Sequence, residues 1–277
     1  MKNIKGSLKY LHISNEVAEA KITFQGAHLF HFQPKGQVPL LWMSESASFE
    51  KGKAIRGGIP VCWPWFGPHP TDNTLPNHGF ARTSLWTHIK TEEINERETK
   101  VTMRLNSSEE SLQLWPFHFE LILEIYIAKE LKVSLITKNT DTKAFSITDA
   151  LHTYLAIDDI NTVYIDGLDQ KKYYDKTDES FYNIQEGRLS FTKETDRIYQ
   201  GVTSVLSVHE QNRCIQVKTE GSHTVVIWNP GEALAKKMPD LSDHKRMLCV
   251  ESANALEDAP LIKPNESHRL TTIISLD

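Results

Sequence analysis

The stretch FHFELILEIYIAK, residues 117–129, decides the class of fold that this sequence can adopt. Its apolar residues recur at every second position, at Phe117, Phe119, Leu121, Leu123, Ile125 and Ile127. Such alternation buries one face of a β-strand, whereas a helix repeats its apolar residues about every 3.6 positions. The stretch LKVSLIT, residues 131–137, follows after a short polar break, so the two segments are expected to form a β-hairpin.

The same alternation continues elsewhere in the chain. AEAKITF (18–24) and HRLTTIISL (268–276) are expected to be strands, and CIQVKT (214–219) and HTVVIWNP (223–230), separated by EGS, predict a second hairpin. Only EALAKKM (232–238) predicts a short helix. Because no internal repeat, linker or low-complexity segment interrupts the pattern, we expect one all-β domain over residues 1–277. Its architecture would be a large antiparallel β-sandwich with two big sheets packed face to face.

Composition narrows the class of partner. The 277 residues have 39% hydrophobic content and a formal net charge of −5, which argues against nonspecific binding of nucleic acid but allows a local basic pair to hold a small anion. The three cysteines form no CxxC motif and favour reduced thiols over a disulfide framework. No apolar run has the length of a signal peptide core or a membrane span. We therefore expect a cytoplasmic protein that does not bind membranes. The sequence leaves its oligomeric state open, and a monomer is the default expectation.

Several motifs that would indicate a cofactor are missing from the sequence. There is no Gly-rich phosphate loop of Walker type and no GxSxG elbow, and HEQNR (209–213) lacks the second histidine of a zincin helix. The twelve histidines show no metal-ligand spacing along the chain. The sequence thus predicts neither a bound metal nor an organic cofactor.

Two segments carry arginines where a small anion could bind. AIRGGIPVCWPWFGPHP (54–70) is too rich in proline and glycine for a helix or a regular strand, and it predicts a stiff loop that presents Arg56. LPNHGFART (75–83) predicts a turn with Asn77, His78 and Arg82. Two arginines on two loops can form a fork-shaped clamp for phosphate or carboxylate. The alternative is an ordinary ion pair for Arg56 and a capping role for Arg82.

Two further segments carry groups able to move protons. In DALHTYL (149–155) alternation puts His152 on one strand face with Ala150 and Tyr154, and in RMLCVESAN (246–254) Glu251 shares a face with Met247 and Cys249. A carboxylate on an apolar face has a raised pKa, and an imidazole in a cleft exchanges protons near neutral pH. The alternatives are a core histidine and a glutamate that reaches solvent at a strand end.

One weaker segment, ETDRIY (194–199), carries Asp196 and is expected to form a turn. The tryptophans Trp63, Trp65 and Trp228 are candidates for an apolar wall beside a ligand. Packing in the core is the alternative for each of them.

Together, the ordered motifs IRGGIP, LPNHGFAR, DALHTY, ETDRIY, VIWNP and VESAN resemble those of the D-hexose-6-phosphate mutarotase (glucose-6-phosphate 1-epimerase) family, within the aldose 1-epimerase superfamily. The resemblance runs from about Arg56 to Glu251 and includes the final strand, so it covers most of the chain. It implies a β-supersandwich similar to galactose mutarotase.

The resemblance also implies roles for particular residues. His152 and Glu251 match the catalytic pair, and a second set matches substrate-binding positions: Arg56, Asn77, His78, Arg82, Asp196 and Trp228. Asn77 stands where glutamine is expected, which changes the reach of one amide. The implied activity is interconversion of the α and β anomers of hexose 6-phosphates, with Glu251 as base and His152 as acid and with no cofactor. Two other hypotheses remain: an aldose 1-epimerase for free sugars, and a noncatalytic carbohydrate-binding or sensor protein.

Overall fold

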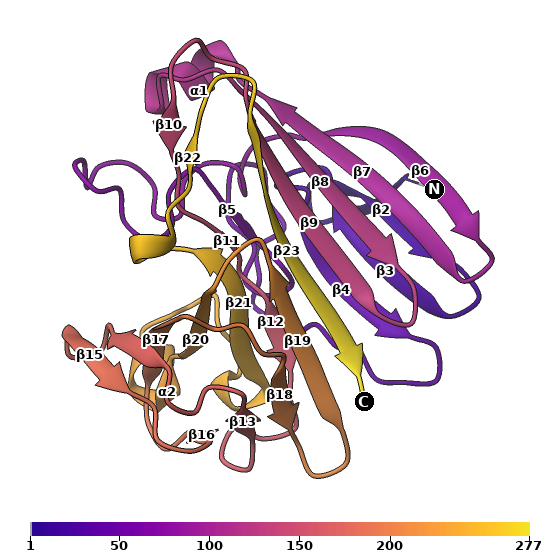
Figure 1. Ribbon diagram of the computed structural model, residues 1–277. Coiled ribbons are helices and arrows are strands. Elements are labelled where there is room, and N and C mark those ends of the chain that lie inside the picture. The colour runs from indigo at the N-terminus through magenta and orange to yellow at the C-terminus, as the bar shows by residue number, and fades with distance from the viewer. Residues whose placement is uncertain (1) are drawn as a thin grey trace.

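Antiparallel β-sheets account for most of the regular structure in the computed structural model, which describes residues 2–277 apart from the side chains of residues 2, 181 and 182 (Figure 1). The larger sheet has nine strands, in the order β16 (Leu189–Ser190), β13 (Tyr164–Asp166), β18 (Leu206–His209), β19 (Cys214–Glu220), β23 (Ser267–Leu276), β9 (Leu131–Asn139), β8 (Phe119–Ile127), β7 (Glu98–Asn106) and β6 (Thr87–Asn95).

Three other sheets complete the fold. The eight-stranded sheet has the order β15 (Ser180–Ile184), β14 (Lys172–Asp175), β17 (Thr195–Gln200), β20 (Thr224–Asn229), β21 (Met247–Asn254), β11 (Asp149–Leu151) and β5 (Val61–Cys62), and β12 (Tyr154–Ala156) also pairs with β21. The four-stranded sheet contains β1 (Lys2–Lys5), β2 (Leu8–Ser14), β3 (Ala18–Thr23) and β4 (Leu29–Pro34). A small sheet pairs β10 (Phe145–Ser146) with β22 (Leu261–Ile262).

The alternating stretch at residues 117–129 forms β8 as expected. Every second residue of β8 is buried, beginning with Phe119, and β8 pairs along its whole length with β9. The first predicted hairpin is therefore confirmed, and so are the strands predicted at residues 18–24 and 268–276. The buried face of β8 lies in the main hydrophobic core because its alternating apolar residues cannot all be covered within one sheet.

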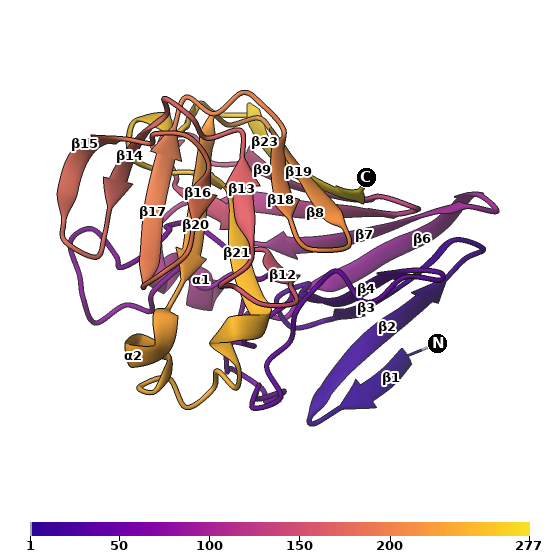
Figure 2. The ribbon, with the colours of Figure 1, turned by 90° about the horizontal axis from the view of Figure 1, so that it is seen from below.

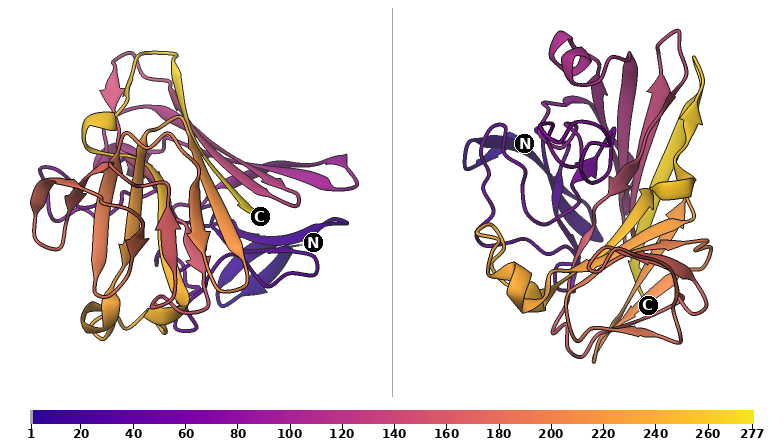
Figure 3. Two further views of the ribbon diagram at one scale, coloured as in Figure 1. Left: turned by 60° about the horizontal axis from the view of Figure 1, so that its bottom comes forward. Right: turned by 90° about the vertical axis from the view of Figure 1, so that its left-hand side faces the viewer.

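The three large sheets pack as layers around this core. Figures 2 and 3 show the four-stranded sheet against the end of the nine-stranded sheet formed by β6–β9, and the eight-stranded sheet beside β18, β19 and β23. One hydrophobic cluster includes Ile22 of β3, Leu121 of β8 and Val250 of β21, which come from all three sheets. The predicted antiparallel β-sandwich is confirmed, although two sheets rather than one lie opposite the nine-stranded sheet.

The second predicted hairpin is wrong. Residues 214–219 lie in β19, between β18 and β23, whereas residues 224–229 form β20, between β17 and β21 in the other large sheet. Both edges of each strand are thus already paired with other strands. The EGS segment therefore carries the chain from one layer to the other instead of turning it back on itself. The hydroxyl of Ser222 anchors this crossing by donating to the carbonyl of Ala253.

Short irregular elements also differ from the expectations. The helix expected at 232–238 is present as the shorter α2 (Gly231–Ala235). Three further short elements were not predicted because their sequences show no helical periodicity of apolar residues: α1 (Glu109–Leu114) and the 3₁₀ turns η1 (His244–Arg246) and η2 (Leu256–Asp258). The ETDRIY segment is not a turn, since residues 195–200 form β17 inside the eight-stranded sheet. Among the described residues, no helix has both the length and the apolar character needed to cross a membrane.

The proline-rich segment at residues 54–70 is a buried connection as far as Trp65, and beyond it Pro68 and Pro70 are exposed. Most of the segment from Ile55 to Trp65 is buried, and Val61 and Cys62 pair with β11 at one edge of the eight-stranded sheet. Gly58, at φ 64°, passes so close to the preceding strand that a Cβ there would lie 2.4 Å from the carbonyl oxygen of Leu29. Trp63 is fully buried, so core packing is the correct interpretation for this tryptophan.

The turn at Gly79 offers a test of this close packing. Gly79 has φ 68°, and a Cβ would lie 1.9 Å from the carbonyl oxygen of Trp63. A backbone contact of that length cannot relax by rotating a side chain, so Gly79→Ala should combine left-handed strain of about 1–2 kcal/mol with an overpacking penalty of about 1–3 kcal/mol. The free energy of unfolding, measured by denaturant titration, reports the sum.

Gly67 provides the matched control for this measurement. It has φ 80° in the same region of the chain, yet a Cβ there would meet nothing within 4 Å. Gly67→Ala should therefore reduce the free energy of unfolding only by the cost of the left-handed strain, about 1–2 kcal/mol. Equal losses for the two variants would show that the contact with Trp63 does not limit the turn.

Candidate active site

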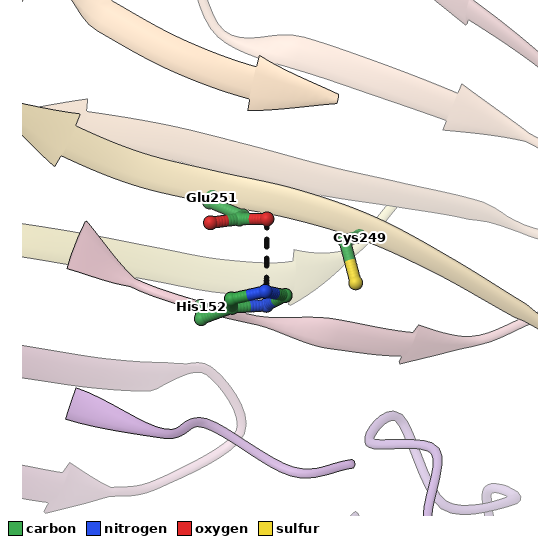
Figure 4. A group of neighbouring side chains, drawn as sticks. All are labelled: His152, Cys249 and Glu251. Atoms are coloured by element: carbon green, nitrogen blue, oxygen red, sulfur yellow. Dashed lines mark ion pairs between the residues drawn. The ribbon is translucent and has the colours of Figure 1, made fainter. Parts of the chain in front are cut away.

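The two groups expected to move protons meet across neighbouring strands. In the pairing of β11 and β12 with β21, Leu151 lies opposite Ser252 and Tyr154 lies opposite Cys249. The strand is interrupted between them, but the register is the same on both sides, which places His152 opposite Glu251. Nδ1 of His152 lies 3.4 Å from Oε1 of Glu251. The dashed line in Figure 4 marks this pair.

Burial controls the charge of this pair. His152 is 8% exposed and Glu251 is 1% exposed. Burial raises the pKa of Glu251 well above its ordinary value, with a contribution from the negative charge of Asp196. Burial also lowers the pKa of His152, and positive charges that include Arg56 act in the same direction. The uncharged form, a carboxyl group beside a neutral imidazole, is therefore favoured in the free site, and this pair holds one proton.

Aromatic side chains hold the imidazole of His152 in place. The ring of Tyr154 stacks on it, with centroids 4.7 Å apart and planes 8° from parallel. The rings of His78 and Trp228 meet it edge to face, at 5.7 Å and 6.1 Å between centroids. Two of the residues expected at the substrate site, His78 and Trp228, thus contact the predicted acid directly.

Arg56 is connected to the same group of rings. Its Nη1 donates to the hydroxyl of Tyr154 at 2.9 Å, and its Nε donates to a carboxylate oxygen of Asp240 at 3.1 Å. The ion pair that was the alternative for Arg56 is therefore present, with a partner that no motif indicated. Because Tyr154 stacks on His152, the guanidinium is only one side chain away from the imidazole.

The turn at residues 76–79 brings a second arginine to the site. Nη2 of Arg82 donates to the backbone carbonyl of Asn77 at 2.7 Å. Asn77 itself is exposed. Burial, with Arg82 as the next contributor, lowers the pKa of His78 to about 3. Within the described part of the chain, Arg82 has no carboxylate at ion-pair distance, so its charge is less compensated than that of Arg56.

Asp196 lies on the opposite side of β21 from His152, beyond the neighbouring strand β20. It occupies β17 directly opposite Trp228 of β20, and its carboxylate pairs with Nζ of Lys176 at 2.9 Å. Lys176 also lines a groove of about 420 Å³ together with Trp65 and Phe66. Since Phe66 packs on His78, this groove lies next to the rings around His152.

The chain is similar to known proteins over nearly its whole length. A family model described as aldose 1-epimerase matches residues 9–275. A relative from Escherichia coli (strain K12), provisionally named a glucose-6-phosphate 1-epimerase, is 36% identical over 96% of this chain and 90% of its own. A relative from Cenchrus ciliaris with the same provisional name is also 36% identical, over 90% of this chain and 79% of its own. The chain belongs to the aldose 1-epimerase family.

A solved structure supports the same assignment. A crystal structure from Salmonella typhimurium, of a protein provisionally named a mutarotase, superposes with a TM-score of 0.92 at 32% identity and covers 99% of this chain and 92% of that one. The fold expected from the family resemblance is therefore confirmed for this aldose 1-epimerase family member.

Sequence reasoning missed three functional candidates in this family member. Lys176 and Asp240 occur in polar segments without any motif, and only the fold places them against Asp196 and Arg56. Cys249 had been placed on the same face as Glu251, but its proximity to His152 depends on strand register. The sequence offers no signal for the contacts of Lys176 with Asp196, of Asp240 with Arg56 or of Cys249 with His152, because each joins different segments of the chain.

A buried histidine supports the backbone that presents Arg56. His28 is 1% exposed, and its Nε2 would lie 2.7 Å from a Cβ placed on Gly58. Burial lowers the pKa of His28 to about 3. The imidazole is therefore neutral in the folded protein over the whole range in which a solvated histidine gains a proton.

This difference predicts a loss of stability in acid. The unfolded chain binds a proton at His28 below about pH 6.5, while the folded chain does not until about pH 3. The contribution of neutral His28 to the free energy of unfolding is therefore complete above about pH 6.5 and declines as the pH falls from about 6.5 to about 3. His28→Asn should reduce the slope of unfolding free energy against pH by up to about 1.4 kcal/mol per pH unit. Denaturant titrations between pH 4 and 7 measure that slope.

The exposed residue His223 supplies the control, as His223→Asn. Its slope should match that of the parent protein. An unchanged slope in His28→Asn would show that His28 takes up its proton in the folded state.

Proposed function

We propose that this protein interconverts the α and β anomers of hexose 6-phosphates, with glucose 6-phosphate as the first substrate to test. The observation that carries the proposal is the buried pair of His152 and Glu251, which holds an acid and a base 3.4 Å apart beside several cations. The provisional name of the relative from Escherichia coli, a glucose-6-phosphate 1-epimerase, supports the same activity. The provisional name of the Salmonella typhimurium structure, a mutarotase, supports the exchange of anomers.

The reaction needs one proton to be removed and one to be supplied. Glu251, as the carboxylate, takes the proton of the C1 hydroxyl, and His152, as the imidazolium, donates a proton to the ring oxygen. The bond between C1 and the ring oxygen then breaks, and C1 becomes an aldehyde. Rotation about the C1–C2 bond exposes the other face of the aldehyde. The reverse proton transfers close the ring as the opposite anomer.

The pair carries a single proton throughout this cycle. That proton sits on His152 before ring opening and on Glu251 afterwards, so the pair is electrically neutral overall in both states. Burial tolerates a neutral pair far better than a net charge. Burial favours the form with the proton on Glu251, whereas the positive charge of Lys176 lowers the pKa of Glu251 and thereby helps to form the carboxylate that starts the reaction.

The cations around the pair support a phosphorylated substrate. Arg56 and Lys176 each already have a carboxylate partner, Asp240 and Asp196 respectively, while Arg82 donates only to a backbone carbonyl in the described part of the chain. A phosphate dianion would therefore find an uncompensated charge at Arg82 and would have to compete with Asp240 at Arg56. Arginine presents a planar fork of donors that matches phosphate geometry.

Two other functions make different predictions. An aldose 1-epimerase for free sugars would keep Arg56 and Asp240 paired and would use them to bind hydroxyl groups. A noncatalytic binding or sensor protein would bind the phosphosugar without exchanging its anomers. NMR exchange spectroscopy with glucose 6-phosphate, free glucose and free galactose separates the three. Exchange that is fast only for the phosphosugar supports the proposal, and no acceleration for any sugar contradicts it.

The acid and the base should each be needed for turnover. His152→Ala and Glu251→Gln are expected to lower kcat by about 10²–10⁴-fold, because a positioned acid or base contributes that much. The measurement is anomer exchange of glucose 6-phosphate, with circular dichroism to establish folding. His223→Ala and Glu257→Gln, at exposed positions, are the matched controls and should keep full activity. Near-normal exchange in a folded His152 or Glu251 variant would contradict these roles.

The arginines should matter for the phosphate more than for the chemistry at C1. A hydrogen bond to a charged group contributes about 1.5–3 kcal/mol, so Arg56→Ala or Arg82→Ala should raise KM for glucose 6-phosphate about 10- to 150-fold. We expect the larger effect at Arg82, because Arg56 must first release Asp240. Any slow exchange of free glucose should change little.

The control for this comparison is Arg97→Ala, which removes a charge from an exposed position. It should leave KM for both sugars unchanged. Equal losses for phosphorylated and free glucose in Arg56→Ala and Arg82→Ala would mean that these arginines shape the reacting centre, and the phosphate clamp would have to be abandoned.

A further inference from the structure

The proposed reaction does not use the thiol of Cys249, although this group lies beside the acid–base pair. Cys249 precedes Glu251 by two residues on β21, so the two side chains share a face of the strand. One ligand atom from each of His152, Cys249 and Glu251 lies within 4.8 Å of the other two, and Figure 4 shows the three side chains together. All three residues are buried.

The polar atoms of this cluster are not fully used within the protein. Nδ1 of His152 lies 3.4 Å from Oε1 of Glu251 but makes no hydrogen bond to it, and Oε2 of Glu251 is likewise buried without a hydrogen-bond partner in the described part of the chain. Buried polar atoms in folded proteins nearly always have partners, so unpartnered ones indicate a site for something else. The proposed substrate is one candidate to occupy it. The thiol of Cys249, the third side chain of the cluster, indicates a metal ion as a second candidate.

An imidazole nitrogen, a thiolate and a carboxylate oxygen together suit a zinc ion. Zinc binds these groups at about 2.0–2.3 Å in a tetrahedron, which puts the ligand atoms roughly 3.3–3.8 Å apart. The observed 3.4 Å between Nδ1 of His152 and Oε1 of Glu251 falls in that range, and one ligand atom from each of the three residues lies within 4.8 Å of the others. A small rotation of the side chains would bring the sulfur to ligand distance. The sulfur also disfavours Mg²⁺ and Ca²⁺, which prefer oxygen ligands.

Charge balance favours a divalent ion in this buried position. One thiolate and one carboxylate neutralise Zn²⁺, so the complex carries no net charge, and the protons lost from the thiol and the carboxyl group pass to solvent. A neutral complex avoids most of the penalty for burying an ion. Three protein ligands leave the fourth position open to water or a substrate hydroxyl.

We propose that His152, Cys249 and Glu251 form a binding site for a thiophilic divalent cation of the Zn²⁺ type, and that occupancy of this site inhibits the enzyme. The inhibition rests on the proposed function, because the metal would take the same lone pairs that move protons during ring opening. Metal binding by the three side chains is independent of the proposed function. Zn²⁺ and the sugar should therefore exclude each other from the site.

Binding is tested with Co²⁺ as a spectroscopic probe for zinc sites and with Zn²⁺ in competition against a coloured chelator. The parent protein should bind one ion, Co²⁺ should show sulfur-to-metal charge-transfer absorption, and Mg²⁺ should not compete. Loss of an outer-shell partner already weakens a metal site 10- to 100-fold, so Cys249→Ala should weaken binding by at least about 100-fold. Cys214→Ala and Cys62→Ala remove the other two thiols and should leave binding unchanged.

The outcomes separate this proposal from the proposed function. No stoichiometric binding by the parent protein, binding without sulfur absorption, or equal binding by a folded Cys249→Ala protein would overturn the metal site. Cys249→Ser, which nearly preserves the side-chain volume, replaces Cys249→Ala if the latter fails to fold.

Activity is measured separately: Zn²⁺ should inhibit anomer exchange in the parent and much less in Cys249→Ala, and equal inhibition of both would overturn the inhibitory role. A parent protein that binds the metal but exchanges no anomers would contradict the proposed function alone.

Discussion

The cross-strand placement of His152 opposite Glu251 is the constraint on which the rest of the site depends. It follows from the antiparallel register between β21 and the two short strands β11 and β12, which is the same on either side of the interruption at residues 152–153. Directly opposed residues have Cβ atoms about 4.5–5.5 Å apart, close enough for both side chains to act on the same small molecule. A slip of one residue would turn Glu251 to the other face of the sheet.

Burial gives this pair its chemical character. Every residue of β21 is buried, so Glu251 cannot reach solvent and its pKa is raised, while the pKa of His152 is lowered in the same environment. A shared proton allows both groups to remain buried without net charge. The nearby cations are mostly balanced by their own carboxylates, at Asp240 and Asp196. The charges of the site are thus close to balance, and the proposed anionic substrate would have to use Arg82 or exchange with one of these carboxylates.

The buried connection at residues 54–70 positions the arginine side of the site. Glycines let its backbone pass against neighbouring chain, as at Gly58, and a short strand within it pairs with β11. Arg56 is thereby held at the edge of the aromatic group formed by Tyr154, His152 and Trp228. The unusual composition of the segment is explained by this position: its large apolar side chains pack inward while its one arginine remains beside the pair.

The sequence by itself determined the fold class and the types of group at the site. Period-two alternation predicted β8 and β9 and most long strands because a strand with one buried face must alternate, whichever neighbours it has. The motifs also indicated His152 and Glu251 and the residues around them. Local pattern failed where a connection could either turn back or cross between layers, as after β19, and where a polar strand such as β17 is covered by its neighbours.

Only the tertiary structure decided which side chains meet. Arg56 pairs with Asp240, Asp196 pairs with Lys176, and Cys249 approaches His152. Each of these contacts joins different segments of the chain, whose separation in sequence carries no information about distance. The pKa directions of Glu251 and His152 likewise depend on desolvation by whole layers of sheet. Residue type is local, whereas register and burial arise from the packing of the entire chain, and these two properties bring a histidine and a glutamate together as a buried pair with shifted pKa values.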